Sequence, residues 1–209
     1  MTRRFTHRIK RLLGDRASTG LAIDRALHSG ALDEASRLLD GLAETGGNDG
    51  PLCLQRARLA GQRHEHEQMI DWAQRAIAQK IDDPIALATV AFGNICLGRD
   101  YVAEVISQNL AEANPKSPLG ALCLAGTALI GGKDDESAQY LTTAEQLDPK
   151  HPALLLITAA WWRNAKDVSS EVSALTFYRE LYGDTPAIAA RFAALGCAVT
   201  VRPRQPLPS

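Results

Sequence analysis

Apolar side chains recur along this chain at the spacing of one face of an α-helix, and short polar or glycine-containing stretches separate the apolar runs. This pattern predicts consecutive helices joined by short turns, so that neighbouring helices form antiparallel pairs. The helices are expected at residues 18–29, 32–44, 50–61, 66–80, 84–97, 101–113, 118–130, 134–147, 152–165, 170–182 and 186–198. The sequence therefore predicts an all-α fold in which only the last helix has no pairing partner.

Prolines repeat with a fixed period from residue 84 onward. Pro84, Pro118, Pro152 and Pro186 are each 34 residues apart, and each follows a polar residue. Proline fits the first turn of a helix, because the N–H that it lacks would have no partner there. Pro115 and Pro149 fall just beyond a second helix, where proline ends it. The prolines thus predict a helix pair that repeats every 34 residues.

Small residues follow the same period. With Pro84 as position 1, position 8 holds Ala57, Ala91, Ala125, Ala159 and Ala193. Alanine at one point of five copies indicates a close helix crossing where only a methyl group fits, and Ala193 predicts that the last helix packs like the others. Position 20 holds Ala35, Met69, Ala103, Ser137 and Glu171. The acidic side chain of Glu171 predicts a shifted or loosely packed second helix in its repeat.

These columns resemble the tetratricopeptide repeat (TPR), which has small residues at positions 8 and 20, a small or apolar residue at position 27 and proline at position 32. The repeats are expected at 16–49, 50–83, 84–117, 118–151 and 152–185, and 118–151 is the most complete copy. The first, second and fifth are weaker, since Ile23, Met69 and Glu171 stand where a small residue is usual. The resemblance implies a right-handed superhelical solenoid of about five repeats over 16–198, with 186–198 as a capping helix.

A partner-binding groove is implied by the same resemblance, because the first helix of each TPR lines the concave surface. The residues at its inward positions are Ile85, Ala88, Phe92, Ile95, Leu119, Leu122, Gly126, Leu129, Leu156, Ala160 and Arg163. Chaperone-binding members of the family hold a carboxylate there with Lys, Asn and Arg, and those residue types are absent at Ala88 and Phe92, and again at Leu122 and Gly126. The groove is expected to bind an apolar or amphipathic segment of a protein or peptide. Self-assembly through the same surface is the alternative.

Both ends of the chain differ from the repeats. Residues 1–15 are basic and place Phe5, Ile9, Leu12 and Leu13 on one helical face. This amphipathic helix either packs on the first repeat or contacts an anionic membrane surface, and packing is preferred because so short a helix binds membranes weakly. Residues 199–209 contain three prolines and two arginines, and are expected to form an extended tail.

Composition and motifs argue against several kinds of function. The net charge is −1 and no basic stripe is present, so nucleic-acid binding is not expected. No nucleophile motif or phosphate loop stands out, and His64 and His66 are expected at a solvated turn. Trp162 is expected in the core, and packing is preferred over an interface role for Trp161.

The four cysteines form no CxxC pair and are interpreted as small buried hydrophobes with free thiols, which suits a reducing cytoplasm. The sequence therefore predicts a non-catalytic cytoplasmic scaffold without cofactor or metal. Contact with the periphery of a membrane is expected only if the basic N-terminal helix binds lipid.

Overall fold

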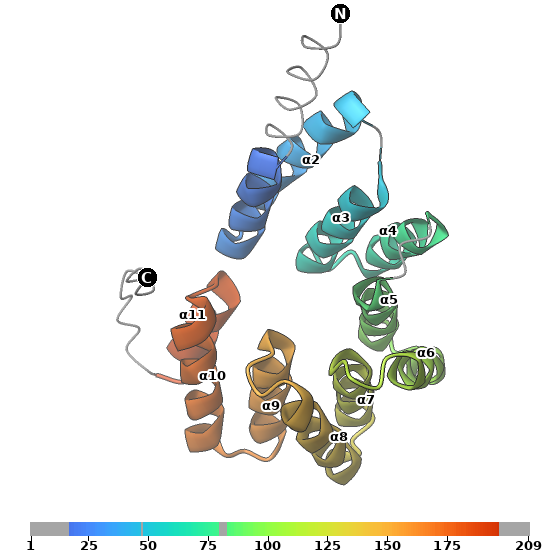
Figure 1. Ribbon diagram of the computed structural model, residues 1–209. Coiled ribbons are helices and arrows are strands. Elements are labelled where there is room, and N and C mark those ends of the chain that lie inside the picture. Colours follow the sequence, from blue (N-terminus) through green and yellow to red (C-terminus); the bar gives the residue numbers. More distant parts are fainter. Residues whose placement is uncertain (1–16, 47, 80–82, 197–209) are drawn as a thin grey trace, which may run out of the picture. The chain divides into compact units, whose positions relative to one another are not determined.

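The computed structural model describes residues 17–46, 48–79 and 83–196 (Figure 1). The basic amphipathic segment with Phe5, Ile9, Leu12 and Leu13 and the tail at 199–209 lie outside the described residues. The chain divides into two compact parts between Gly93 and Asn94, inside one helix. The residues up to Gly93 are called the first part below, and those from Asn94 onward the second part.

All the regular secondary structure of the described residues is helical, as predicted (Figure 1). Residues 17–29 form a helix that precedes α2 (Leu32–Gly46), α3 (Gly50–Gln62), α4 (His66–Ala78) and α5 (Pro84–Cys96). The second part continues with α6 (Asp100–Ala113), α7 (Leu119–Ile130), α8 (Asp134–Leu147), α9 (Pro152–Asn164), α10 (Val168–Tyr182) and α11 (Pro186–Ala194). Within the parts, α3 pairs with α4, α7 with α8 and α9 with α10. No helix of the described residues is long and apolar enough to cross a membrane.

The predicted helix starts have local causes. Proline lies in the first turn of α9 and α11, as the 34-residue period predicts. The side chain of Thr185 accepts a hydrogen bond from the backbone N–H of Ile188, and that of Asp167 accepts one from Ser170. These bonds satisfy amide groups that have no partner inside the helix. Asp167 also explains why α10 begins two residues before the predicted residue 170.

The turn inside each repeat uses a left-handed residue at position 15. These residues, with φ between 60° and 76°, are Gly30, His64, Gly98, Gly132 and Lys166. At all five turns the residue after it donates its backbone N–H to the carbonyl five residues earlier, as Lys133 does to Ala128. This hydrogen bond is the helix-ending motif that glycine favours, because glycine adopts a positive φ without steric cost. Five equivalent turns, 34 residues apart, confirm the repeat.

The alanine column is confirmed in four of its five members. Ala57, Ala91, Ala125 and Ala159 are completely buried. Ala193 is exposed, so the prediction that it packs like the others is wrong. Helix α11 instead buries Ile188 and Phe192 in a cluster with Leu155, Leu175 and Tyr178. Position 8 is covered where a second helix follows, and no second helix follows α11 within the described residues.

Two glycines let helices approach within the parts. A Cβ added to Gly93 in the first part would lie 2.6 Å from a side-chain carbon of Ile70 in α4. A Cβ added to Gly120 in the second part would lie 2.5 Å from the Cα of Ala111 in α6. Both distances are far shorter than a van der Waals contact, so a side chain would displace the Ile70 side chain at Gly93 and the α6 backbone at Gly120. The repeat columns did not identify either glycine.

Candidate functional site

Helix α5 carries an exposed apolar stripe. Ile85 and Phe92, both predicted groove residues, are 52% and 51% exposed. They are seven residues apart, about two helical turns, and so lie on one face. Between them, the Thr89 hydroxyl donates a hydrogen bond of 2.7 Å to the carbonyl of Ile85. The stripe therefore presents apolar surface whose one intervening polar side chain is already satisfied.

The other predicted groove residues differ in exposure. Ala88, Ile95, Leu122 and Leu129 are buried, whereas Leu119, Gly126 and Ala160 are half-buried and Leu156 is exposed. Leu122 belongs to a core cluster with Leu141 and Leu154, so it stabilises the α7–α8 pair and offers little surface to a partner. Among the predicted apolar residues, a partner could reach Ile85, Phe92 and Leu156 most readily.

Arg163, the charged member of the predicted set, binds a buried carboxylate. Glu171 in the first turn of α10 is only 1% exposed. Its Oε1 lies 2.7 Å from Nε of Arg191 in α11 and 3.1 Å from Nε of Arg163 in α9. A second bond of 2.8 Å joins Glu171 Oε2 to Nη2 of Arg191. These three side chains are called the Glu171 cluster below.

The Glu171 cluster holds three helix ends together, and it corrects one prediction. Helix α10 is not shifted, because the two arginines satisfy the carboxylate at position 20. The hydrogen bonds from Arg191 hold the pKa of Glu171 below its usual value, against the opposing effect of burial. The Glu171 carboxylate is therefore charged at neutral pH, and its ion pairs join α10 to α9 and α11.

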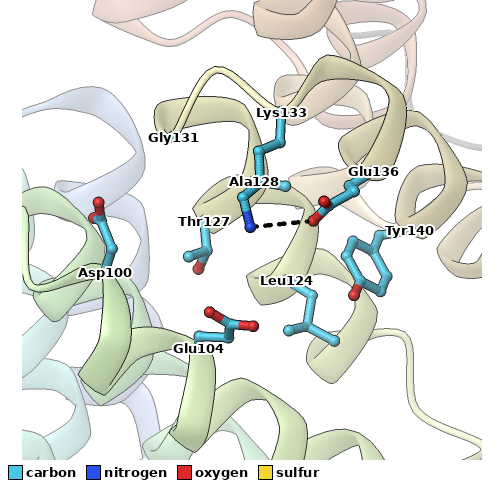
Figure 2. A pocket seen from close by; sticks show the side chains of 9 residues that line it. All are labelled: Asp100, Glu104, Leu124, Thr127, Ala128, Gly131, Lys133, Glu136 and Tyr140. Atoms are coloured by element: carbon cyan, nitrogen blue, oxygen red, sulfur yellow. Dashed lines mark ion pairs between the residues drawn. The ribbon is translucent and has the colours of Figure 1, made fainter.

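A small polar pocket lies between α6, α7 and α8 (Figure 2). Its volume is about 80 Å³, and Asp100 and Glu104 of α6 face Lys133 and Glu136 across it. Nζ of Lys133 lies 3.4 Å from Oε2 of Glu136, so the cation pairs with the acid of its own neighbouring turn. The lining combines these charged side chains with Leu124 and Tyr140, and the small volume leaves little room for a ligand.

A larger apolar pocket lies between α8, α9 and α10, and is called the aromatic pocket below. Its volume is about 260 Å³. The lining residues are Ala138, Leu141, Thr142, Glu145, Pro149, Leu154, Leu155, Thr158, Trp161, Trp162 and Phe177. Phe177 is 41% exposed at its rim. Sequence reasoning missed this pocket, because its walls come from three helices.

No protein-family model and no curated protein matches the sequence. Solved structures do match the fold. A thermophilic TPR protein of Thermus thermophilus has a TM-score of 0.69 at 13% identity, over 86% of this chain and 97% of that chain. The type IV pilus biogenesis factor PilW has a TM-score of 0.60 at 13% identity, over 91% and 90%. YrrB, described as a TPR protein with an unusual peptide-binding site, has a TM-score of 0.50 at 13% identity, over 91% and 97%.

This chain has the tetratricopeptide-repeat fold. The TPR register relates the two pockets to one another. Thr127 and Ala128 line the polar pocket, and 34 residues later Trp161 and Trp162 line the aromatic pocket. Glu104 and Leu124 of the polar pocket likewise correspond to Ala138 and Thr158 of the aromatic pocket, so the two pockets overlap in the repeat register. Large aromatic side chains give the second pocket its apolar character.

The two tryptophans of the aromatic pocket play different parts in the TPR core. Trp161 packs on the cluster of α7 and α8, and its indole N–H donates a hydrogen bond of 3.0 Å to the carbonyl of Asp134. This confirms packing as its role. Trp162, expected in the core, is only half-buried. Its indole ring meets that of Trp161 edge to face, with centroids 4.6 Å apart.

The cysteines and histidines of the TPR helices fit the sequence interpretation in part. Cys53 and Cys123 are buried, as predicted, but Cys96 is exposed because it ends α5, and Cys197 lies outside the described residues. Burial raises the pKa of the Cys53 thiol, and it raises that of Cys123 to about 12. His64 is exposed at its turn, as predicted. The described residues contain no group of three metal-ligand side chains suited to hold an ion.

Proposed function

We propose that this chain is a non-catalytic protein-interaction scaffold that binds an apolar or amphipathic segment of a partner on the face of its first helices. The observation that carries the proposal is the exposed pair of Ile85 and Phe92 on one stripe of α5. Large apolar side chains at half exposure are characteristic anchors of protein interfaces, and covering them with a partner is favourable.

The spacing of the stripe describes the partner. Two residues seven apart on a helix lie roughly 10 Å apart along the axis. An amphipathic partner helix with apolar residues at a similar interval would contact both, and so would an extended segment of three or four residues. The TPR fold supports this interpretation, as does the peptide-binding site stated for YrrB. Leu156 on α9 offers a further apolar contact within the second part.

A peptide selection tests the proposal. Peptides selected from a random library on the native chain should be apolar or amphipathic, and the double variant Ile85→Glu/Phe92→Glu should lose their binding by about a hundredfold. The matched control is Tyr101→Glu on α6, whose side chain is 79% exposed and lies off the first helices. Circular dichroism would confirm that each variant is folded.

The selection has two opposing outcomes. Peptides that bind the double variant as tightly as the native chain would overturn the proposal. Loss of an oligomer in the double variant, measured by light scattering, would assign the stripe to self-assembly instead. Leu122→Glu is unsuitable as a test, because its side chain is 2% exposed and a charge there would unfold the α7–α8 pair.

We also propose a reducing compartment such as the cytoplasm, since Cys53, Cys96 and Cys123 form no disulfide within the described residues. Contact with a membrane through residues 1–15 is the further alternative. Flotation with anionic vesicles tests it, and equal flotation after removal of residues 1–15 would contradict it.

A further inference from the structure

The aromatic pocket combines an apolar floor with an aromatic and acidic rim. Leu141, Leu154 and Leu155 are buried beneath it, while Phe177 and Glu145 are exposed at its edge. Within the part of the chain that the structure describes, the Glu145 carboxylate forms no ion pair and the indole N–H of Trp162 has no hydrogen-bond acceptor. The pocket thus offers aromatic faces, one N–H donor and one carboxylate to a single ligand.

These groups suit an extended segment that contains proline and arginine. Proline-rich segments adopt a polyproline II helix and dock on aromatic grooves, where an indole N–H donates to a ligand carbonyl. An arginine beside the prolines pairs with a carboxylate and stacks on aromatic rings. Helix α8, which forms one wall, contains four acidic residues and no basic residue. The wall therefore complements a basic ligand in charge.

The chain itself supplies such a segment. Residues 199–209 read Val-Thr-Val-Arg-Pro-Arg-Gln-Pro-Leu-Pro-Ser. Pro203 and Pro206 are three residues apart, which is one turn of polyproline II, so they would share a face in that conformation. Arg202 and Arg204 flank the first of them. No acidic residue interrupts this stretch.

The Glu171 cluster puts the end of α11 close to the pocket. Arg191 in α11 and Arg163 in α9 bind the same carboxylate, and Arg163 directly follows Trp162. The last turns of α9 and α11 therefore each carry an arginine that binds the first turn of α10. The stretch from Gly196 to Arg202 spans up to roughly 20 Å when extended. That length suffices to cross the end of α10, since a helix is about 10 Å wide.

We propose that residues 199–209 bind in the aromatic pocket of their own chain, with the prolines against Trp162 and Phe177 and an arginine paired with Glu145. Because the segment is covalently joined to α11, its effective concentration at the pocket is in the millimolar range, and weak contacts are enough for it to bind. The bound segment covers apolar surface that the described residues leave open.

Tryptophan fluorescence can report the binding. The chain has three tryptophans, and Trp72 lies in α4 and does not line the pocket. In the Trp72→Phe background, the emission therefore comes from Trp161 and Trp162 alone. Removal of residues 199–209, with α11 kept, should shift this emission to longer wavelength and raise its quenching by acrylamide about twofold. A synthetic peptide of residues 199–209 should reverse both changes.

Paired variants locate the binding. Phe177→Ala in the shortened Trp72→Phe chain should weaken the peptide about tenfold. Val168→Ala is the matched control, because Val168 lies on the same helix, is 52% exposed and does not line the pocket. Glu145→Gln should weaken the peptide about threefold and reduce its salt dependence. Asp135→Asn, an exposed acid elsewhere on α8, should leave the affinity unchanged.

Three results would overturn the proposal. The first is equal emission and equal quenching with and without residues 199–209. The second is a peptide affinity that Phe177→Ala does not change. The third is a quenching difference that disappears when the full chain is diluted, since this would assign the pocket to the tail of a second copy. The Ile85→Glu/Phe92→Glu variant should leave the effect of the tail unchanged, so the proposed function and this inference can fail separately.

Discussion

At the same point of two consecutive repeats, the α7–α8 pair buries Ser137 and the α9–α10 pair buries Glu171. The Ser137 hydroxyl donates a hydrogen bond of 3.0 Å to the carbonyl of Ala125, and nothing charged is needed nearby. Leu129 and Ile157 stand where the fifth repeat and α11 carry Arg163 and Arg191. The comparison teaches that position 20 of this chain accepts a buried charged residue when arginines of neighbouring helices neutralise it, whereas its other four copies hold uncharged residues.

The two helix pairs also differ in the side chains that line their pockets. One pocket lies between the second helices α6 and α8, and the other lies between the second helices α8 and α10. Small and charged side chains line the first pocket, which measures about 80 Å³, and tryptophans line the second, which measures about 260 Å³. Two consecutive repeats can thus keep the same turns while different side chains at equivalent positions, such as Thr127 and Trp161, give them different surfaces.

The largest loss of stability is expected when glutamate, which the fifth repeat has at position 20, replaces the serine at position 20 of the fourth repeat. Ser137→Glu should lower the free energy of unfolding by at least about 4 kcal/mol, because the carboxylate would be buried without a cation. Urea denaturation followed by circular dichroism measures this. Ser137→Ala is the control and should cost about 1 kcal/mol, the value of one buried hydrogen bond. A Ser137→Glu variant as stable as the control would break the comparison.

Removal of one cation from the Glu171 cluster should have the next largest effect. Arg191→Ala deprives the buried carboxylate of two hydrogen bonds and should cost about 3 kcal/mol. Arg163→Ala should cost about 1 kcal/mol, since its half-exposed side chain supplies only one bond. The two losses should not be additive in the double variant, because both arginines act on one carboxylate. Equal losses of unfolding free energy in Arg191→Ala and Arg163→Ala would contradict the greater role that the hydrogen bonds assign to Arg191.

The pH dependence of stability should report the Glu171 charge. Its folded pKa lies below its usual value of 4.5, so its ionised form stabilises the fold above that pH. The contribution is lost as the pH falls from about 4.5 through the folded pKa, because the folded and unfolded states are then both protonated. Glu171→Gln should therefore be about 2 kcal/mol less stable than the native chain at neutral pH, with a gap that narrows in acid. A gap that is constant with pH would contradict the assignment.

The smallest effect is expected at the turn. Position 15 is Gly132 in the fourth repeat and Lys166 in the fifth, with φ of 69° and 60°. A residue with a side chain loses roughly 1 kcal/mol in this conformation, so Lys166→Gly should stabilise the fold by about that amount. Gly132→Ala should destabilise it by a similar amount. Thermal unfolding measures both changes in stability. A change of the same sign in the two variants would contradict the prediction.

Most of the fold could be predicted because its signals are local. Proline in a first turn and a left-handed turn residue act within a few residues, so a 34-residue period fixed most helix ends to within two residues. The register also identified buried alanines from spacing alone. It failed at Ala193, whose burial would need a further helix, and at Cys96, which lies at a helix end.

The surfaces were harder to predict, because they depend on contacts between helices distant in sequence. Arg191 lies twenty residues after Glu171, and only their alignment on adjacent helices shows that they pair. Arg163 matched an inward position of the family, yet the structure gives it an acidic partner. The aromatic pocket requires Phe177 to lie beside Trp162 across two helices. Opposite charges at facing positions of the register are the signal that could have revealed the Glu171 cluster.

The two buried thiols give the molecule a reporter in each part. Cys53 lies in the first part and Cys123 in the second, and burial raises the pKa of both. The thiolate is the nucleophile that attacks an alkylating reagent, so each of these two buried cysteines reacts only after its own part opens. The ratio of the two labelling rates measures whether the helices on either side of the Gly93–Asn94 division open together or independently. Mass spectrometry of the two labelled cysteines can thereby follow in time how the two parts joined by α5 open.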